Sequence, residues 1–264
     1  MDIPLLGLGT YNLRNKECTK IVQEALKMGY RHIDTALAYE NHKAVGKALK
    51  EFNREEIFIT SKYFLDQLNP KKIEAGVQKA CSRALKELDL EYLNLFLIHW
   101  PDRSLPMSEI VKAMEALVAS GKVRHIGVSN FTVHHLEDLH RDGCHPEANQ
   151  VEFHPYLFQK SLLEYCQKHK MQLIAYRPFG KGELLKDPLL NELGGKHQKS
   201  AAQVILRWLI QHKIPTIPKA SSVEHLKENF SAFDFVLSRE EMKRLDSLHR
   251  NLRFCEPDYA TFDY

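Results

Sequence analysis

The sequence of 264 residues lacks the patterns that mark membrane, disulfide-rich and metal-binding proteins. Its five cysteines are an odd number without framework spacing, so we expect reduced thiols in a cytoplasmic protein. Neither His-Glu-x-x-His nor Cys-x-x-Cys occurs, and no metal site is expected. No apolar run approaches the roughly 20 residues of a membrane span. No basic segment followed by an apolar one indicates a signal peptide.

An excess of charge of one sign is also missing, because 37 Lys and Arg residues nearly balance 34 Asp and Glu residues. The resulting net charge of +3 is spread along the chain, which favours neither a nucleic-acid partner nor a membrane surface. Hydrophobic residues make up 44% of the chain and charged residues 27%, which is typical of a globular protein. We therefore expect neither nucleic acid nor a membrane among its partners.

Strand-like and helix-like segments alternate along the whole chain. The predicted strands cover residues 5–10, 31–34, 57–62, 93–99, 124–130, 149–153, 172–177 and 214–218. Helical periodicity follows each strand, with an extra helix at 186–193 and a last one at 238–248. Eight alternations without a linker predict an α/β fold, a single (β/α)8 TIM barrel over residues 1–264. The alternative, an open doubly wound sheet, would need a glycine-rich phosphate turn that Gly7-Leu8-Gly9 does not provide.

Several helix ends have their own sequence signals. Gly29 is placed to end the first helix, and Asn41 to cap the second. Asn69-Pro70 is typical of a helix start, and Ser200 of an N-cap.

Ionisable side chains stand at the ends of three successive strands. Asp34 ends the second strand, Lys62 the third and His99 the fourth, and Tyr39 follows in a polar loop. The carboxyl ends of parallel strands share one edge, where chemistry is assembled. The sequence therefore predicts that these four side chains meet. They would form either a catalytic group or merely a strand-end ion pair beside a packed Tyr and His.

The four residue types suit proton transfer to a carbonyl oxygen. A free tyrosine has a pKa near ~10, and a neighbouring lysine ammonium is expected to lower it. Asp34 would hold Lys62 charged and in place, and His99 would orient a substrate oxygen or share in the proton relay. Together they predict a phenol at Tyr39 that protonates a carbonyl oxygen as it gains negative charge.

Five motifs spread over the chain resemble those of the aldo-keto reductase superfamily. They are RHIDTALAYEN at 31–41, LIHWP at 97–101, IGVSNF at 126–131, NQVE at 149–152 and IPK at 217–219. In its short length the chain resembles the bacterial 2,5-diketo-D-gluconate and methylglyoxal reductases. The resemblance implies a barrel that binds an extended nicotinamide cofactor, with Tyr39 as general acid, Lys62 and Asp34 tuning it, and His99 orienting the carbonyl. Hydride would pass from the nicotinamide to the carbonyl carbon.

The resemblance also implies a set of cofactor residues. Ser129, Asn130 and Gln150 would hold the nicotinamide carboxamide, and Tyr176 would stack on its ring. Lys219 would face the 2′-phosphate, and Glu228 and Asn229 the adenine. Considered without the resemblance, the first three residues indicate only a polar pocket rim, and Tyr176 indicates a core tyrosine. Lys219, Glu228 and Asn229 then indicate a solvated helix face. The full expected set is Gly9, Thr10, Tyr11, Asp34, Ser129, Asn130, Gln150, Tyr176, Arg177, Phe179, Lys219, Ala220, Ser221, His225, Glu228 and Asn229.

Some positions depart from the family pattern. Arg177 stands where serine is common, and would either reach the cofactor pyrophosphate or form a surface ion pair. His225 replaces the arginine that selects NADP, and Ala220 replaces a serine. Lys219 and Ser221 are retained, so NADPH is the expected cofactor, with NADH left open.

An aromatic wall with one polar corner is expected around the substrate, which suits a small aldehyde or an α-dicarbonyl compound. The expected wall consists of Tyr11, Tyr39, Phe64, His99, Trp100 and Phe131. The aromatic residues near the C-terminus would either join it or pack against the barrel. They are Phe254, Tyr259, Phe262 and Tyr264.

Two other functions are compatible with the same residues. One is a non-catalytic barrel that binds nicotinamide as a sensor or subunit. The other is a lyase that forms a Schiff base at Lys62, which would need a neutral lysine although Asp34 should keep it charged. In the family reading the protein is an NADP-dependent reductase of small carbonyl compounds, and a monomer.

Overall fold

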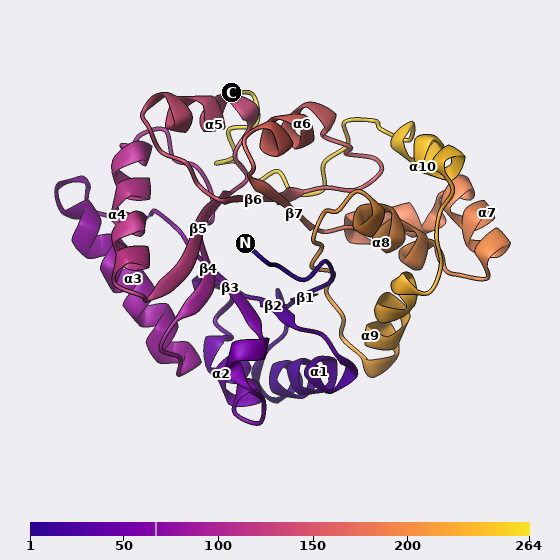
Figure 1. The fold of residues 1–264 in the computed structure, drawn as a ribbon, viewed down its shortest axis with the longest axis horizontal. Coiled ribbons are helices and arrows are strands. Elements are labelled where there is room, and N and C mark those ends of the chain that lie inside the picture. Colours follow the sequence, from indigo (N-terminus) through magenta and orange to yellow (C-terminus); the bar gives the residue numbers. More distant parts are fainter. Residues whose placement is uncertain (67) are drawn as a thin grey trace.

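The computed structural model describes residues 1–66 and 68–264, in which seven parallel strands pair in sequence order from β1 to β7 (Figure 1). The strands are β1 Leu8–Gly9, β2 His32–Asp34, β3 Phe58–Tyr63, β4 Leu93–Ile98, β5 Val123–Ser129, β6 Ala148–Glu152 and β7 Gln172–Tyr176. The helices are α1 Asn15–Met28, α2 His42–Leu49, α3 Ile73–Leu88, α4 Met107–Ala119, α5 Val133–Arg141, α6 Lys160–Lys168, α7 Pro188–His197, α8 Ala201–Gln211, α9 Val223–Phe230 and α10 Arg239–Asp246. Helices surround the strands on the outside, which confirms the predicted (β/α)8 barrel.

The predicted eighth strand is the main departure from the expected elements. Segment 214–219 forms isolated bridges, with Thr216 joined to Leu6 and Ala175, and Lys219 joined to Gly9. Pro215 and Pro218 explain this, because proline has no N–H to donate to a ladder. The segment still closes the barrel between β7 and β1 by backbone hydrogen bonds on both sides. The first strand is likewise shorter than predicted, with two residues in place of six.

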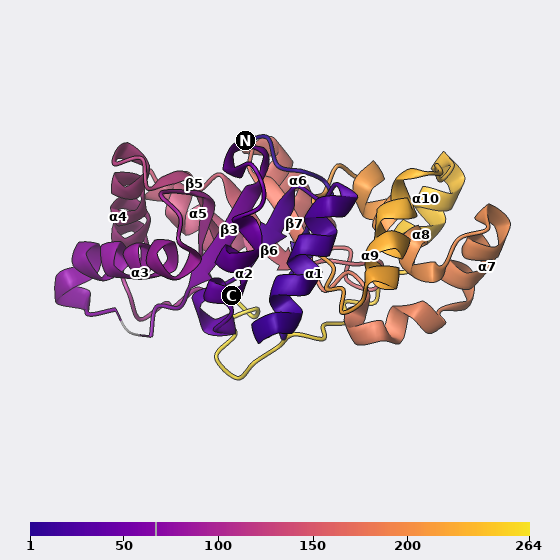
Figure 2. The ribbon, with the colours of Figure 1, turned by 90° about the horizontal axis from the view of Figure 1, so that it is seen from below.

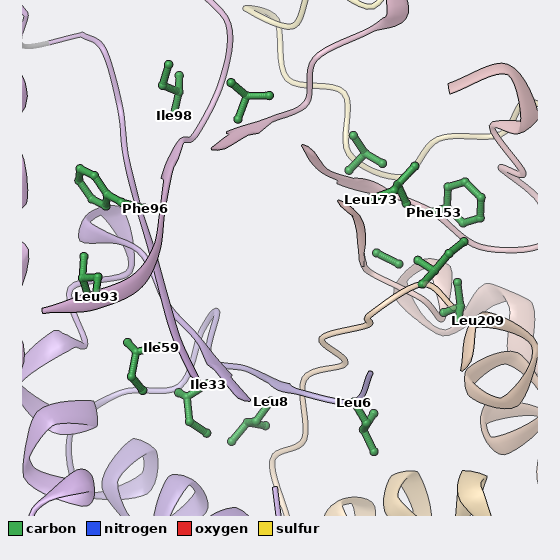
Figure 3. Close-up of a cluster of buried hydrophobic side chains, with 14 of the residues drawn as sticks. Leu6, Leu8, Ile33, Ile59, Leu93, Phe96, Ile98, Phe153, Leu173 and Leu209 are labelled. Atoms are coloured by element: carbon green, nitrogen blue, oxygen red, sulfur yellow. The ribbon is translucent and has the colours of Figure 1, made fainter. Parts of the chain in front are cut away.

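Apolar packing fills the space on both sides of the sheet. Figure 3 shows side chains of the larger cluster, among them Ile33, Phe96 and Leu173, around the outside of the strands. A smaller cluster includes Leu95 and Leu97, which alternate with Phe96 along β4. Five of the six residues of β4 are completely shielded and Asn94 is partly exposed, as expected for a parallel strand between two layers.

The helix-end signals hold with one exception. Gly29 adopts the left-handed conformation (φ 107°) that ends α1, and the Ser200 side chain caps α8. Asn41 stands at the N-cap position of α2, but its side chain makes no capping bond, so that expectation is wrong. Its amide instead accepts from Thr35 Oγ1 (2.7 Å) and donates to the carbonyls of Thr10 and Leu13. Asn41 therefore ties the loop that carries Tyr39 to the end of β1.

The two ends of the chain lie at opposite ends of the barrel (Figure 2). The C-terminal segment crosses the end to which the strands point. Among the described residues, no helix is both long enough and apolar enough to cross a membrane. Over the same residues, no group of three or more His, Cys, Asp or Glu side chains is arranged to hold a metal ion.

The contact between α2 and α3 has no room for a side chain at Gly46. A Cβ atom there would lie 2.1 Å from the carbonyl oxygen of Leu88. We expect Gly46→Ala to lower the free energy of unfolding by about 2–3 kcal/mol, since backbone must move to admit the methyl group. Gly195→Ala is the matched control, because this position in α7 faces open space. Alanine there should raise the free energy of unfolding by up to ~1 kcal/mol. Urea unfolding measures both, and equal effects would contradict the packing argument.

Candidate active site

A cavity of about 590 Å³ opens among residues at or just beyond the carboxyl ends of the strands. The predicted site residues that line it are Gly9, Tyr11, Asp34, Tyr39, Phe64, His99, Trp100, Ser129, Asn130, Gln150, Tyr176, Arg177 and Lys219. Asp34 ends β2, Ser129 ends β5 and Tyr176 ends β7, so the strand-end argument accounts for their meeting.

Other predicted residues are not on the wall of this cavity. They are Thr10, Lys62, Phe131, Phe179, Ala220, Ser221, His225, Glu228 and Asn229. Lys62 lies directly behind the wall, and Thr10 donates to the carbonyl of Asp34 (2.9 Å). Phe131 packs against His135 instead of facing a substrate, because it is buried beneath α5. The remaining ones belong to the loop after β7 and to α9 and the loop before it.

Lys62 is the hub of the four predicted catalytic residues. Its Nζ atom donates to the Asp34 carboxylate (2.5 Å), to the Thr35 carbonyl (3.1 Å) and to the Tyr39 hydroxyl (3.3 Å). The side chains of Lys62 and Asp34 are 1% and 2% exposed. All three donor positions of the ammonium are thus used, and one of them is directed at the phenol.

The ion pair keeps Lys62 charged in spite of its burial. Burial alone lowers the pKa of Lys62, but Asp34 and Tyr39 raise it by more, so the net shift is upward. For Asp34, burial raises the pKa, and Lys62 and Gln150 act in the opposite direction. A neutral Lys62, which a Schiff-base mechanism would need, is not what this environment favours.

The pKa of Tyr39 does not shift as expected. Lys62 does lower the pKa of the phenol, but burial raises it by more, and the result lies above the ordinary value. The expectation of a lowered pKa was therefore wrong, because it left desolvation out. Tyr39 is fully protonated at neutral pH, which is the form that donates a proton.

His99 is held neutral beside the phenol. Burial, and secondly the charge of Lys62, lower the pKa of His99 well below its ordinary value. Its ring centroid lies 5.9 Å from that of Tyr39 and 4.5 Å from that of Phe64. The Nδ1 atom is buried and has no hydrogen-bond partner within residues 1–66 and 68–264. A neutral imidazole can direct a substrate oxygen without adding charge.

A chain of polar contacts joins the predicted cofactor residues to the ion pair. The Tyr176 hydroxyl donates to Asn130 Oδ1 (2.7 Å), and Asn130 Nδ2 donates to the His99 carbonyl (2.9 Å). Gln150 Nε2 donates to the second oxygen of Asp34 (2.8 Å). Ser129 donates to the Gln150 carbonyl (2.7 Å). These side chains are therefore held in one arrangement at the cavity wall.

Three cationic side chains line the cavity, those of Arg177, Lys181 and Lys219. The guanidinium of Arg177 donates to the Phe254 carbonyl (2.6 Å), a contact that neither sequence alternative anticipated. Lys181 was missed by the sequence reading, although it lies in a Gly-Lys-Gly turn with a left-handed φ of 56°. A turn of that composition directly after a strand was the available signal.

Of the two residues expected near the adenine, Glu228 has another partner. The Glu228 carboxylate accepts from Ser200 Oγ (2.5 Å), the N-cap of α8. Asn229 is buried, while His225 is exposed in the first turn of α9. Their roles as cofactor contacts stay predictions.

The C-terminal segment supplies the part of the wall that sequence motifs did not locate. Its residues at the cavity are Phe254, Cys255, Glu256, Pro257 and Tyr259. The Tyr259 ring meets Trp100 (5.4 Å between centroids) and Phe64 (6.2 Å) edge to face. Of the four tail aromatics, Phe254 and Tyr259 join the wall, whereas Phe262 packs on Trp100 and Tyr264 against His135. Ala38 and Ile217 also line the cavity; both lie in the family motifs, but neither was predicted as a site residue.

Comparison with known proteins decides the family. The model of the aldo/keto reductase family matches residues 5–250. The chain belongs to the aldo/keto reductase family. It is 44% identical to a glyoxal reductase of Bacillus subtilis, over 99% of this chain and 95% of that protein. It is 42% identical to a 9,11-endoperoxide prostaglandin H2 reductase of Trypanosoma cruzi, over 97% and 92%.

A solved aldo/keto reductase shares the architecture of this family member. The crystal structure of MGS-M4, an aldo-keto reductase enzyme from a deep-sea metagenome library, superposes with a TM-score of 0.92 at 37% identity. The match covers 100% of this chain and 97% of that one. Family membership and fold, both expected from the motifs, are thus confirmed.

The buried ion pair can be tested through stability. Asp34→Asn leaves the Lys62 ammonium buried without a counter-charge, and we expect a loss of about 3–5 kcal/mol in urea unfolding at pH 7. Adding Lys62→Met should restore much of it. In the single variant the pKa of Lys62 falls below its unfolded value, so the unfolded state holds more protons and stability should rise with pH up to about 10.

Asp89→Asn is the control for this charge removal. Asp89 forms an ion pair with Lys50 in which the two side chains are 72% and 65% exposed, so little or no loss is expected. If Asp34→Asn were as mild as this control, or if Lys62→Met gave no recovery, the ion pair would not be the organising contact of the site.

Proposed function

We propose that this protein reduces small aldehydes and α-dicarbonyl compounds to alcohols, with NADPH as the expected hydride donor. One observation carries the proposal: Lys62 joins the Asp34 carboxylate to the Tyr39 hydroxyl at the wall of the cavity. The carbonyl-reducing relatives support the reaction class, and the glyoxal reductase of Bacillus subtilis supports a small dicarbonyl substrate.

The cavity fits a nicotinamide dinucleotide. Its wall combines the flat ring of Tyr176, the amides of Asn130 and Gln150, and the cations Lys181 and Lys219. An aromatic surface suits a nicotinamide ring, amides suit its carboxamide, and cations suit phosphates. When bound, the reduced nicotinamide would supply the hydride that the carbonyl carbon accepts.

The residues of this chain would handle the oxygen and the proton. Neutral His99 directs the carbonyl oxygen toward Tyr39, whose raised pKa keeps its proton available. Tyr39 donates that proton as the oxygen becomes negative, and the Lys62 ammonium stabilises the phenolate left behind. Asp34 holds Lys62 in place, so the group needs no rearrangement during the reaction.

We further infer a cytoplasmic monomer, with residues 1–264 acting as one reductase domain. The five cysteines are free, and burial raises the pKa of the Cys18 and Cys166 thiols to about 12, which suits reduced structural thiols. The nearly balanced charge offers no support for a nucleic-acid partner.

The first test removes the proton donor. Tyr39→Phe should lower kcat/KM for glyoxal reduction by about 10²–10⁴-fold, because the carbonyl oxygen loses its acid. NADPH binding, followed by quenching of intrinsic fluorescence, should stay close to that of the unsubstituted protein. Binding without turnover by the unsubstituted protein on any aldehyde would instead favour a nicotinamide-binding sensor.

Tyr63→Phe is the matched control. Tyr63 is buried one position beyond Lys62, and its hydroxyl has no hydrogen-bond partner in the described part of the chain. The same removal of an oxygen atom should leave glyoxal reduction unchanged. Comparable losses in both variants would mean that the effect of Tyr39→Phe is not chemical.

A second test addresses cofactor choice. His225→Arg places a guanidinium in the exposed first turn of α9, close in sequence to Lys219 and Ser221. We expect the ratio of NADH to NADPH dissociation constants to rise by roughly tenfold, because the fork of arginine suits a 2′-phosphate. An unchanged ratio in fluorescence titration would show that position 225 does not lie near the 2′-phosphate.

A further inference from the structure

The C-terminal segment is attached to the barrel beside the cavity at Phe254 and Cys255, and again at its end, where Thr132 Oγ1 donates to the Tyr264 carbonyl (2.6 Å). Residues 251–264 lie within the described part of the chain and form neither helix nor strand, so they depend on other contacts for their position. The backbone of Phe254 is hydrogen-bonded on both sides: its N–H donates to Glu152 (2.9 Å) and its carbonyl accepts from Arg177 (2.6 Å). Figure 2 shows this segment crossing one end of the barrel.

Glu152, the last residue of β6, is a buried acceptor built for this contact. Its side chain is 0% exposed. One carboxylate oxygen accepts from His154 Nε2 (3.0 Å) and the Phe254 N–H, and the other accepts from the Cys255 N–H (2.8 Å). A buried carboxylate is stable only when such donors satisfy it. The Glu152 carboxylate therefore depends on the N–H groups of the segment, and the segment is held in place by Glu152.

Arg177 and Gly180 hold the other side of Phe254. Arg177 follows the last residue of β7 in a left-handed conformation (φ 49°), which is uncommon for a side chain of this size. The Phe254 ring lies against Gly180, where an added Cβ atom would come within 2.5 Å of it. The loop after β7 is therefore shaped to receive this one ring.

The attached segment forms a wall of the cavity. Cys255 and Tyr259 both line it. The Tyr259 ring meets the rings of Trp100 and Phe64 edge to face, and the Tyr259 residue itself is about half exposed. The cavity of about 590 Å³ must hold the nicotinamide end of a cofactor as well as a substrate. A fixed Tyr259 therefore limits how large the substrate can be.

We propose that Arg177 and Glu152 are positioning residues that hold residues 254–259 as a fixed wall, and that this wall restricts the substrate to small carbonyl compounds. The proposal rests on the reductase function above. Neither residue acts on the reacting atoms; both act through Phe254. Releasing either contact should let the segment open, which admits larger aldehydes.

Proteolysis tests the attachment without any turnover. Trypsin can cut after Arg253 only when the segment leaves the barrel, because Phe254 is otherwise held from both sides. Arg177→Ser and Glu152→Gln should each increase cleavage after Arg253 by about tenfold or more, followed by mass spectrometry. The glutamine presents an NH₂ group in place of one acceptor oxygen. Arg177→Lys, which can still donate to the Phe254 carbonyl, should restore much of the protection.

Arg244→Ser is the matched control for the arginine substitution. It removes an exposed ion pair with Glu192 between α10 and α7, away from the cavity, and should leave cleavage after Arg253 unchanged. Equal cleavage in Arg177→Ser and Arg244→Ser would overturn the attachment. If Glu152→Gln does not fold, the two substitutions of Arg177 still decide the matter.

Substrate selection tests the second half of the proposal. In Arg177→Ser, the ratio of kcat/KM for 2-naphthaldehyde to that for glyoxal should rise by about tenfold, mainly through a lower KM for the larger aldehyde. An unchanged ratio together with faster cleavage would show that the wall moves without setting substrate size, and would overturn the size restriction. Failure of the unsubstituted protein to reduce either aldehyde would overturn the proposed reductase function, while the cleavage rates would still decide the attachment.

Discussion

A buried ion pair between Lys62 and Asp34 is the contact on which the rest of the site depends. Two charges with almost no exposure are tolerated because the ammonium and both carboxylate oxygens have hydrogen-bond partners. The Thr35 carbonyl and the Tyr39 hydroxyl accept the other two hydrogen bonds of the ammonium, and Gln150 donates to the second carboxylate oxygen. The ion pair that tunes the acid therefore also joins β2, β3 and β6 at the cavity.

The electrostatics of the site come from competition between burial and charge. Burial acts on Lys62, Tyr39 and His99 alike by favouring their neutral forms, and the outcome differs because their neighbours differ. Lys62 has a carboxylate at contact distance and stays charged. His99 has the same ammonium nearby and is driven further toward neutrality. Tyr39 keeps its proton, so the site offers one acid and one neutral hydrogen-bonding ring on the same wall.

The cavity has a rigid side and an attached side. The rigid side is made of strand ends, whose positions follow from backbone pairing between β2 and β7. The attached side is an irregular segment that contributes apolar surface through Tyr259 and is held at Phe254 and, at its end, at Tyr264. The catalytic residues are thus positioned by the strands, while part of the substrate wall comes from a segment that has neither helix nor strand.

The sequence alone determined the alternation of strands and helices, the strand ends that carry Asp34, Lys62 and His99, and the family. Those features follow from local periodicity and from motifs, which a single chain displays directly. Tertiary structure decided what depends on distance and burial: the raised pKa of Tyr39, the reduction of segment 214–219 to bridges, and the contact between Arg177 and the Phe254 carbonyl. Arg177 and Phe254 are 77 residues apart, and no local pattern records a contact at that separation.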